Sequence, residues 1–190
     1  MLNIIACIDK PTRGIGVDGK LLYNIPEDMH LFKQKTKNNI IICGRKTLDS
    51  FKFHAPLPGR TNIVLTSNSE LDYGDACYFM HDVRECIKLA KVLSRQNEVW
   101  VVGGESVYSA FLPHADMLYL TEVEQLPVDQ EHRAADTFFP RFKHLYNETG
   151  RSLVYNIKCN GEELRYQFVQ YRNQYAGCFD LEGNSIYDKK

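Results

Sequence analysis

Residues 39–47 read N-I-I-I-C-G-R-K-T and carry the clearest structural signal in the chain. A run of β-branched residues without polar alternation is typical of a strand buried on both faces, as the strands of parallel sheets are. The run stops at Gly44, and a helical pattern begins at Lys46. A strand that leads directly into a helix predicts an α/β protein.

The same alternation continues along the chain. Further apolar runs cover residues 2–8, 62–66, 98–102 and 117–123, and helical patterns cover residues 26–36, 46–51, 83–93 and 106–112. Residues 152–159 and 163–172 alternate polar and apolar side chains around Asn160-Gly161, a strong hairpin signal. We predict one α/β domain over residues 1–175, with a mostly parallel sheet that ends in an antiparallel hairpin. Residues 124–136 should form a surface loop, and residues 176–190 a C-terminal extension.

The composition argues against several classes of partner. The 190 residues are 44% hydrophobic, which is enough for a buried core, and the formal net charge is −1. This balance gives no sign of a nucleic-acid partner or of a basic membrane surface. No apolar run approaches the ~20 residues of a membrane span. Residues 2–8 lack the basic front of a signal peptide, so we expect a cytoplasmic protein.

Cysteine and histidine spacing predicts neither a disulfide framework nor a metal site. The six cysteines contain no C-x-x-C pair, and without a secretion signal they are expected to be reduced thiols. The six histidines form no H-E-x-x-H or paired Cys/His pattern, so no metal is expected.

Residues 14–19 match the dinucleotide-binding pattern G-x-G-x-x-G, but their surroundings argue against it. In a Rossmann unit this pattern follows a strand directly and opens a helix. Here Pro11-Thr12-Arg13 intervenes, and Pro26 ends the segment that follows. The second strand also ends in Cys43-Gly44-Arg45 instead of the acid that would hold a ribose hydroxyl. We therefore expect the glycines to permit a flexible loop.

Two other turns suit anions better. Gly44-Arg45-Lys46-Thr47 places two cations and a hydroxyl where a helix begins, and helix N-termini attract phosphate. In Gly103-Gly104-Glu105-Ser106, glycines without side chains let the backbone approach a ligand closely. Each turn alone could be an ordinary strand–helix connection. Together they favour a dinucleotide-like ligand, and cations in place of an acid favour NADP over NAD.

Asp28 occupies an unexpected position on its predicted helix. It lies three and four residues before Leu31 and Phe32, so all three share one face, where losing water is costly for a carboxylate. After Leu57-Pro58-Gly59, Arg60 is either a surface charge or a receptor for a ligand carboxylate.

Together, these motifs resemble the dihydrofolate reductase family across roughly residues 2–172. The matching segments, in the order that the family has them, are Ile15-Gly16, Ile25-Pro26-Glu27-Asp28 with Phe32-Lys33 and Thr36, Gly44-Arg45-Lys46-Thr47, Leu57-Pro58-Gly59-Arg60, Val102-Gly103-Gly104 with Val107-Tyr108, Tyr119-Leu120-Thr121, and Asp136-Thr137-Phe138-Phe139-Pro140. Each segment is weak alone, and the set is highly specific.

The resemblance implies an eight-stranded sheet with helices on both faces and the reduction of 7,8-dihydrofolate by NADPH. It also implies competition by antifolates such as methotrexate or trimethoprim, and a monomer. Asp28 would be the buried acid that holds the pteridine, with Thr121 as its hydrogen-bonding partner and Tyr23 as a further catalytic residue. Residues 10–24 would form a lid over the site, and the Gly103-Gly104 peptide bond should be cis.

The resemblance also assigns the binding residues. The substrate side would comprise Ile5, Ala6, Cys7, Met29, Phe32, Phe51, Leu57, Arg60, Val102 and Tyr108. The cofactor side would comprise Ala6, Ile15, Gly16, Leu21, Gly44, Arg45, Lys46, Thr47, Leu65, Thr66, Ser67, Gly103, Gly104, Glu105, Ser106, Val107 and Tyr108.

Two positions depart from the usual family pattern. Leu22-Tyr23 replaces a common Pro-Trp pair, and Glu105 adds negative charge to the turn expected to hold a pyrophosphate. Two alternatives therefore stay open: a catalytically impaired binding protein of this family, and a riboflavin-pathway NADPH reductase with the same fold. Asp28, Phe32 and Arg60 argue against the second, because they suit a pterin with a glutamate tail.

Overall fold

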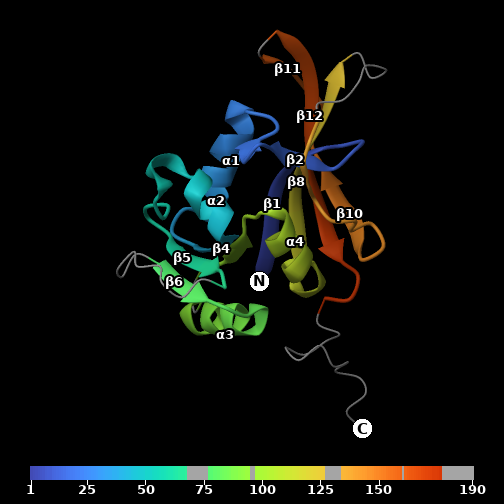
Figure 1. Ribbon diagram of the computed structural model, residues 1–190. Coiled ribbons are helices and arrows are strands. Elements are labelled where there is room, and N and C mark those ends of the chain that lie inside the picture. Colours follow the sequence, from blue (N-terminus) through green and yellow to red (C-terminus); the bar gives the residue numbers. More distant parts are fainter. Residues whose placement is uncertain (68–76, 95–96, 127–133, 160, 177–190) are drawn as a thin grey trace.

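A mixed sheet forms the centre of the computed structural model, which describes residues 1–67, 77–94, 97–126, 134–159 and 161–176 (Figure 1). The strand order is β10-β12-β8-β1-β7-β4-β5-β6, and β11 also pairs with β12. The strands are β1 Leu2–Asp9, β4 Ile40–Gly44, β5 Thr61–Leu65, β6 Cys77–Met80, β7 Val99–Val101, β8 Met117–Leu126, β10 Tyr146–Arg151, β11 Tyr155–Cys159 and β12 Glu162–Asn173.

Parallel and antiparallel parts of the sheet divide as predicted. All pairs from β8 across to β6 are parallel. The C-terminal strand β12 runs antiparallel to β8, β10 and β11. The predicted mostly parallel sheet with an antiparallel C-terminal hairpin is confirmed, with eight strands in continuous order and β11 paired to β12 as a ninth. Gly161 has φ +88 in the turn of that hairpin, whereas Asn160 lies outside the described residues.

Helices cover both faces of the sheet, also as predicted. They are α1 Pro26–Thr36, α2 Arg45–Ser50, α3 Val83–Leu93 and α4 Glu105–Phe111, with short 3-10 turns at Lys52–His54 and Leu112–His114. The three consecutive isoleucines of β4 are explained by burial of both faces of that strand. Ile40 and Ile42 pack into the core under α3 and α4, whereas Ile41 and Cys43 pack into the core that Leu48 of α2 completes.

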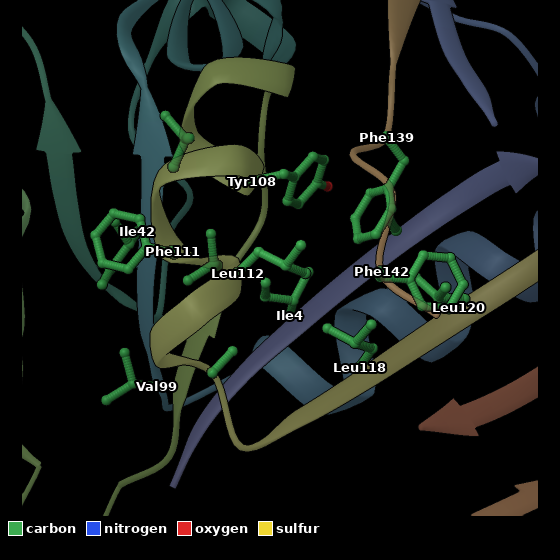
Figure 2. Close-up of a cluster of buried hydrophobic side chains, with 14 of the residues drawn as sticks. Ile4, Ile42, Val99, Tyr108, Phe111, Leu112, Leu118, Leu120, Phe139 and Phe142 are labelled. Atoms are coloured by element: carbon green, nitrogen blue, oxygen red, sulfur yellow. The ribbon is translucent and has the colours of Figure 1, made fainter. Parts of the chain in front are cut away.

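The larger core lies between α3, α4 and the sheet. Figure 2 shows Leu112 of the α4 segment beside Ile4 of β1, the Tyr108 ring directed towards Phe139, and the Phe111 ring beside Ile42 of β4. Helix α3 begins at an Asp82 cap, whose Oδ1 accepts from the Arg84 N–H at 2.6 Å. Its residues Cys86, Ile87 and Ala90 are buried. These two helices therefore stabilise the sheet by ordinary apolar burial.

Helix α1 is different, because only Thr36 is fully buried along its whole length. Its Asp28, Leu31 and Phe32 side chains are half-buried. Pro26 suits its first turn, and Glu27 and Asp28 complement the positive end of the helix dipole. A helix that keeps its inner face partly open beside a sheet leaves room for another molecule there.

The expected loop at residues 10–24 is instead largely a small antiparallel sheet. Strands β2 Gly14–Val17 and β3 Lys20–Leu21 form a hairpin, and β2 also pairs with β9 Thr137–Phe138. Asp18 and Gly19 turn that hairpin with φ +50 and +70. The rejection of a Rossmann turn was correct, since the glycine pattern leads into a strand. The expectation of a loop was wrong for residues 14–17, because they form strand β2 and pair with both β3 and β9.

The expected surface loop at residues 124–136 was also partly wrong. Residues 124–126 continue strand β8, where Leu164 and Arg165 pair with them, and Gln125 is buried. Residues 127–133 and 177–190 lie outside the described residues. In the described part of the chain, no helix is long and apolar enough to cross a membrane.

Candidate active site

Asp28 and Thr121 meet across the open face of α1. The Thr121 hydroxyl donates to Asp28 Oδ1 at 2.6 Å, over 93 residues of sequence. Burial raises the pKa of the Asp28 carboxyl, and the Thr121 hydrogen bond opposes this effect only in part. Asp28 can therefore hold a proton at a higher pH than an exposed aspartate, which suits a group that interacts with a ring that must be protonated.

Cys7 lies beside this pair, because its residue on β1 is the register partner of Thr121 on β8. Burial first, and then the Asp28 and Asp9 carboxylates, raise the pKa of the Cys7 thiol well above its usual value. The thiol is therefore neutral and a poor nucleophile. Cys7 can line the site but is unsuited to covalent chemistry.

Apolar side chains form the walls of the same region. Ile5 and Val102 are buried, and the partly buried Phe32, Phe51 and Leu57 pack against the core cluster to which both belong. Three large apolar side chains that remain half-exposed around a buried patch suit the flat rings of a ligand. Met29, in contrast, is 41% exposed and belongs to none of the buried clusters among the described residues.

Arg60 is held by two hydrogen bonds near the end of α1. Its Nε donates to the Thr36 hydroxyl at 2.8 Å, and its Nη1 donates to the Pro58 carbonyl at 2.8 Å. Gly59, with φ +66, makes the turn that presents it. These bonds fix the guanidinium, and a fixed planar fork recognises carboxylates well.

The two predicted phosphate turns are neighbours. They follow β4 and β7, which are adjacent parallel strands, so both turns lie at the carboxyl edge of the sheet. The Gly44 N–H donates to the Gly103 carbonyl at 2.7 Å, and the predicted cis bond between Gly103 and Gly104 is present. A Cβ on Gly104 would lie 3.4 Å from the Thr47 hydroxyl, and one on Gly103 would lie 3.1 Å from the Tyr108 ring. The turns thus form a bare backbone cradle that fits the phosphates of a dinucleotide.

The cation of the first turn has a local partner. Arg45 Nε lies 2.9 Å from both carboxylate oxygens of Asp49, one helical turn later in α2. The pairing holds the guanidinium at this edge of the sheet and partly neutralises it. Thr66 and Ser67 follow the adjacent strand β5, and the His81 ring Nδ1 lies 2.7 Å from the Thr66 carbonyl. His81 had no recognisable signal in the sequence.

The lid sheet is attached to the rest of the site by backbone and carboxylate contacts. Asp136 Oδ2 accepts from the Asp18 N–H at 2.8 Å, and the Asp136 N–H donates to the Gly16 carbonyl at 3.1 Å. Hydrogen bonds, first of all the one from the Asp18 N–H, lower the pKa of the Asp136 carboxyl. The Glu105 carboxylate accepts from the Phe138 N–H at 3.0 Å. Its side chain is therefore directed towards β9, and its charge is engaged by the lid sheet.

The other predicted lid and cofactor residues occupy distinct environments. Ile15 packs against the larger core, and Leu21 of β3 is 61% exposed. Val107 and Tyr108 are buried in α4, and the Tyr108 hydroxyl donates to the Ile5 carbonyl at 2.9 Å. Ala6 is buried in β1, Leu65 ends β5, and Lys46 and Ser106 lie in the first turns of α2 and α4.

Tyr23 has a partner that the sequence did not indicate. Its hydroxyl donates to Asp9 Oδ1 at 2.8 Å in a buried contact. Asp9 is itself 0% exposed, at the end of β1. In the sequence, Asp9 was visible only as the charge that ends an apolar run, and only the fold reveals that residue 23 returns to it.

Comparisons with known proteins agree on one family. The family model for dihydrofolate reductase matches residues 1–173. The dihydrofolate reductase of Staphylococcus haemolyticus is 34% identical over 139 residues, or 73% of this chain and 76% of that protein. That of Bacillus subtilis strain 168 is 30% identical over 177 residues, or 92% and 95%. A solved dihydrofolate reductase from Enterococcus faecalis, complexed with NADP(H) and RAB-propyl, superimposes with a TM-score of 0.76 at 28% identity, covering 92% of this chain and 96% of that one. The chain belongs to the dihydrofolate reductase family.

Proposed function

We propose that the protein reduces 7,8-dihydrofolate to 5,6,7,8-tetrahydrofolate with NADPH. Membership of the family supports an NADPH-dependent oxidoreductase. The observation that carries the substrate assignment is the Asp28–Thr121 pair, a half-buried carboxylate with a hydroxyl donor beside apolar walls. This arrangement suits a flat pterin ring with an amino group and an adjacent ring nitrogen, which can both hydrogen-bond to one carboxylate.

The rest of the substrate would extend along the apolar wall. Phe32, Phe51 and Leu57 would contact its benzoyl ring, and Arg60, fixed by Thr36 and Pro58, would receive the α-carboxylate of its glutamate. A fixed guanidinium loses little conformational freedom when it binds a carboxylate, so this end of the site is preorganised.

The cofactor would lie along the carboxyl edge of β7, β4 and β5. The backbone of Gly103 to Ser106 would contact its pyrophosphate, and Arg45, Lys46, Thr47, Thr66 and Ser67 would surround its adenine-side phosphate. NADPH, when bound, supplies the hydride that goes to C6 of the pteridine. The chain's own contribution is to hold the two rings in register and to exclude water.

Asp28 would govern the proton half of the reaction. The negative charge of the Asp28 carboxylate would stabilise a protonated pteridine and so raise the pKa of the ring nitrogen next to C6. The proton would reach that nitrogen through water, because in this assignment Asp28 contacts the amino-group side of the ring. We also expect a monomer, as the resemblance to the family implies.

The test is NADPH consumption with dihydrofolate added, in wild type and in Asp28→Asn. We expect dihydrofolate-dependent turnover that falls on the order of a hundredfold in the variant at neutral pH, the size typical of acid–base catalysis. The loss should grow as pH rises, because substrate protonation becomes harder. Normal turnover of the variant at every pH would disprove the role of Asp28.

Ligand binding in the same samples separates the alternatives. If the protein binds NADPH and methotrexate but does not reduce dihydrofolate, the result would favour the catalytically impaired binding protein of this family. Protein that binds NADPH but not methotrexate would instead favour a riboflavin-pathway type of reductase.

A further inference from the structure

Asp9 is a fully buried carboxylate that no step of the proposed reaction uses. It ends β1 and is 0% exposed. Its Oδ2 accepts from the Thr12 N–H at 3.0 Å and from the Thr12 hydroxyl at 2.5 Å. Its Oδ1 accepts from the Tyr23 hydroxyl at 2.8 Å. One buried carboxylate therefore binds residues at the beginning and at the end of the lid.

The backbone around Asp9 is fixed as well. The Arg13 N–H donates to the Asp9 carbonyl at 2.7 Å, and the Lys10 N–H donates to the Val123 carbonyl at 2.8 Å. Asp9 thus occupies a rigid position between β1, β8 and the lid. A buried carboxylate with several donors is costly to move, because any donor that it loses leaves a buried charge less satisfied.

Tyr23 connects this position to the reaction site. Its side chain is 3% exposed and packs with Leu22, Ile25 and Val123, a cluster against which Cys7 also packs. Cys7 and Asp9 are alternate residues of β1, so they face the same side of the sheet. Cys7 senses the charges of both Asp28 and Asp9. Asp9 and Asp28 therefore both lie close to Cys7 of β1. Tyr23, which binds Asp9, comes three residues before the start of α1, the helix that carries Asp28.

The hydrogen bond to Asp9 also determines what Tyr23 can offer to its other neighbours. A phenol has a single O–H group, and here that group points to Asp9 Oδ1. Towards any further neighbour that the Tyr23 oxygen meets, it can therefore only accept. The family's usual tryptophan at this position can only donate a hydrogen bond. The hydrogen bond to Asp9 therefore makes residue 23 an acceptor where the usual residue is a donor.

We propose that Asp9 is a positioning residue for the reductase, which holds the Tyr23 phenol, and with it the end of the lid, so that residue 23 offers the reaction site only a hydrogen-bond acceptor. This inference rests on the proposed function. It assigns to Asp9 an effect on the reaction that is transmitted entirely through Tyr23.

A double-mutant cycle tests that transmission. Single-turnover hydride transfer is measured against pH in wild type, Asp9→Ala, Tyr23→Phe and the double variant, with KM and kcat from steady state. We expect each single substitution to slow hydride transfer by roughly tenfold, the effect of one buried hydrogen bond. In protein that already carries Tyr23→Phe, Asp9→Ala should cost less than about twofold more, because the contact is already absent.

The pH profile distinguishes positioning from simple structural support. In Asp9→Ala the Tyr23 hydroxyl loses its acceptor, and a new hydrogen bond from it towards Asp28, direct or through water, would stabilise that carboxylate. The pH at which hydride transfer falls to half should therefore move lower, and it should return when Tyr23→Phe is added. Thr12→Val is the matched control, since it removes another donor to the same carboxylate, together with the acceptor of the Gly14 N–H, and leaves Tyr23 in place. It should lower the unfolding temperature and change the hydride-transfer rate by less than about twofold.

Three results would overturn the inference. They are an equal cost of Asp9→Ala with and without Tyr23→Phe, an equal effect of Thr12→Val on the rate, and a wild-type rate and pH profile in Tyr23→Phe. The last result decides the question even if Asp9→Ala does not fold. Failure of the proposed function is seen separately, as absence of wild-type turnover with dihydrofolate. The coupling between residues 9 and 23 would then be measured from methotrexate affinity across the same cycle, and strictly additive affinities would overturn it.

Discussion

At the scale of single residues, Asp28 is subject to two opposing influences. Burial raises the pKa of its carboxyl, while the hydrogen bond from Thr121 lowers it, and burial dominates. The fold therefore bears a cost whenever this carboxylate is charged and no ligand is present. Such a cost is expected at a site whose geometry serves binding before stability.

Asp28→Asn should therefore stabilise the ligand-free protein in a pH-dependent way. Between the ordinary aspartate pKa, about 3.9, and the raised pKa in the fold, the folded chain keeps a proton that the unfolded chain has lost. Wild-type stability consequently falls as pH rises through this window. The gain from the variant should be absent below the ordinary pKa and complete above the raised one. Urea unfolding of both proteins across this pH range measures it, and a gain that is constant with pH would contradict the assignment.

Arg60→Ala should weaken dihydrofolate binding by about ten- to a hundredfold, because a charge-assisted, bidentate contact is lost. NADPH affinity should not change, since no cofactor residue contacts Arg60 in this assignment. Thr36→Val is a graded companion, because it removes the acceptor of Arg60 Nε and keeps the guanidinium. Its effect should be smaller and in the same direction. Fluorescence titration with each ligand measures both affinities. An equal loss of NADPH affinity would contradict the assignment of Arg60 to the substrate carboxylate.

At the scale of elements, the proposed cofactor site at the carboxyl edge of β7 and β4, called here the cofactor edge, is built from two strand–helix turns that are far apart in sequence. Gly44 and Gly103 join them through one backbone hydrogen bond. The sequence identified each turn as a candidate anion site, but an ordinary strand–helix connection was an equally good interpretation of the first turn and the usual interpretation of the second. It could not show that the two turns touch. Parallel pairing of β4 with β7 brings them together, which is the usual reason that open α/β sheets bind ligands at the carboxyl ends of their strands.

Arg45→Ala should lower the preference for NADPH over NADH by tenfold or more, since a charged contact to the 2′-phosphate is lost. Asp49→Asn should keep or raise that preference, because it removes a negative charge that lies 2.9 Å from Arg45 Nε. The ratio of kcat/KM for the two cofactors measures both effects. An unchanged ratio in Arg45→Ala would move the phosphate site to Lys46, Thr66 or Ser67.

The lid is the element that sequence reasoning described least well. Its glycines suggested a flexible loop, yet β2 is paired on both sides, by β3 and by β9. Its partner β9 comes from residues 137–138, more than a hundred positions later. Two-residue strands have too few side chains to show a periodic pattern, so neither β3 nor β9 is detectable before the fold is known.

At the scale of the whole molecule, the two faces of the sheet serve different purposes. The face under α3 and α4 is a closed core with large, fully buried side chains such as Phe111 (Figure 2). The face towards α1 keeps Phe32, Phe51 and Leu57 partly exposed. This second face has a buried core of its own, which includes Trp100, but its partly exposed apolar side chains leave room for the proposed substrate.

Phe111→Ala should destabilise the protein by about 3–5 kcal/mol, the cost of a large cavity in a closed core. Ser109→Ala, at an exposed position of the same helix, should change stability by less than about 0.5 kcal/mol. NADPH at about a hundred times its Kd should recover about 2.7 kcal/mol for either variant. Denaturant unfolding with and without the cofactor measures all three. Loss of this recovery in Phe111→Ala alone would mean that NADPH binding depends on the packing of the core around Phe111.

The sequence by itself determined the α/β alternation, the antiparallel end of the sheet, the two glycine turns and the family. These depend on local periodicity, on turn residues and on ordered motifs, all of which are written within short stretches of chain. Only the tertiary structure decided that Tyr23 binds Asp9 and that Glu105 faces Phe138. The physical reason is that a hydrogen bond is selected by distance and burial in space. A polar side chain commonly has several possible partners along the chain, and the packed fold leaves it only those within reach.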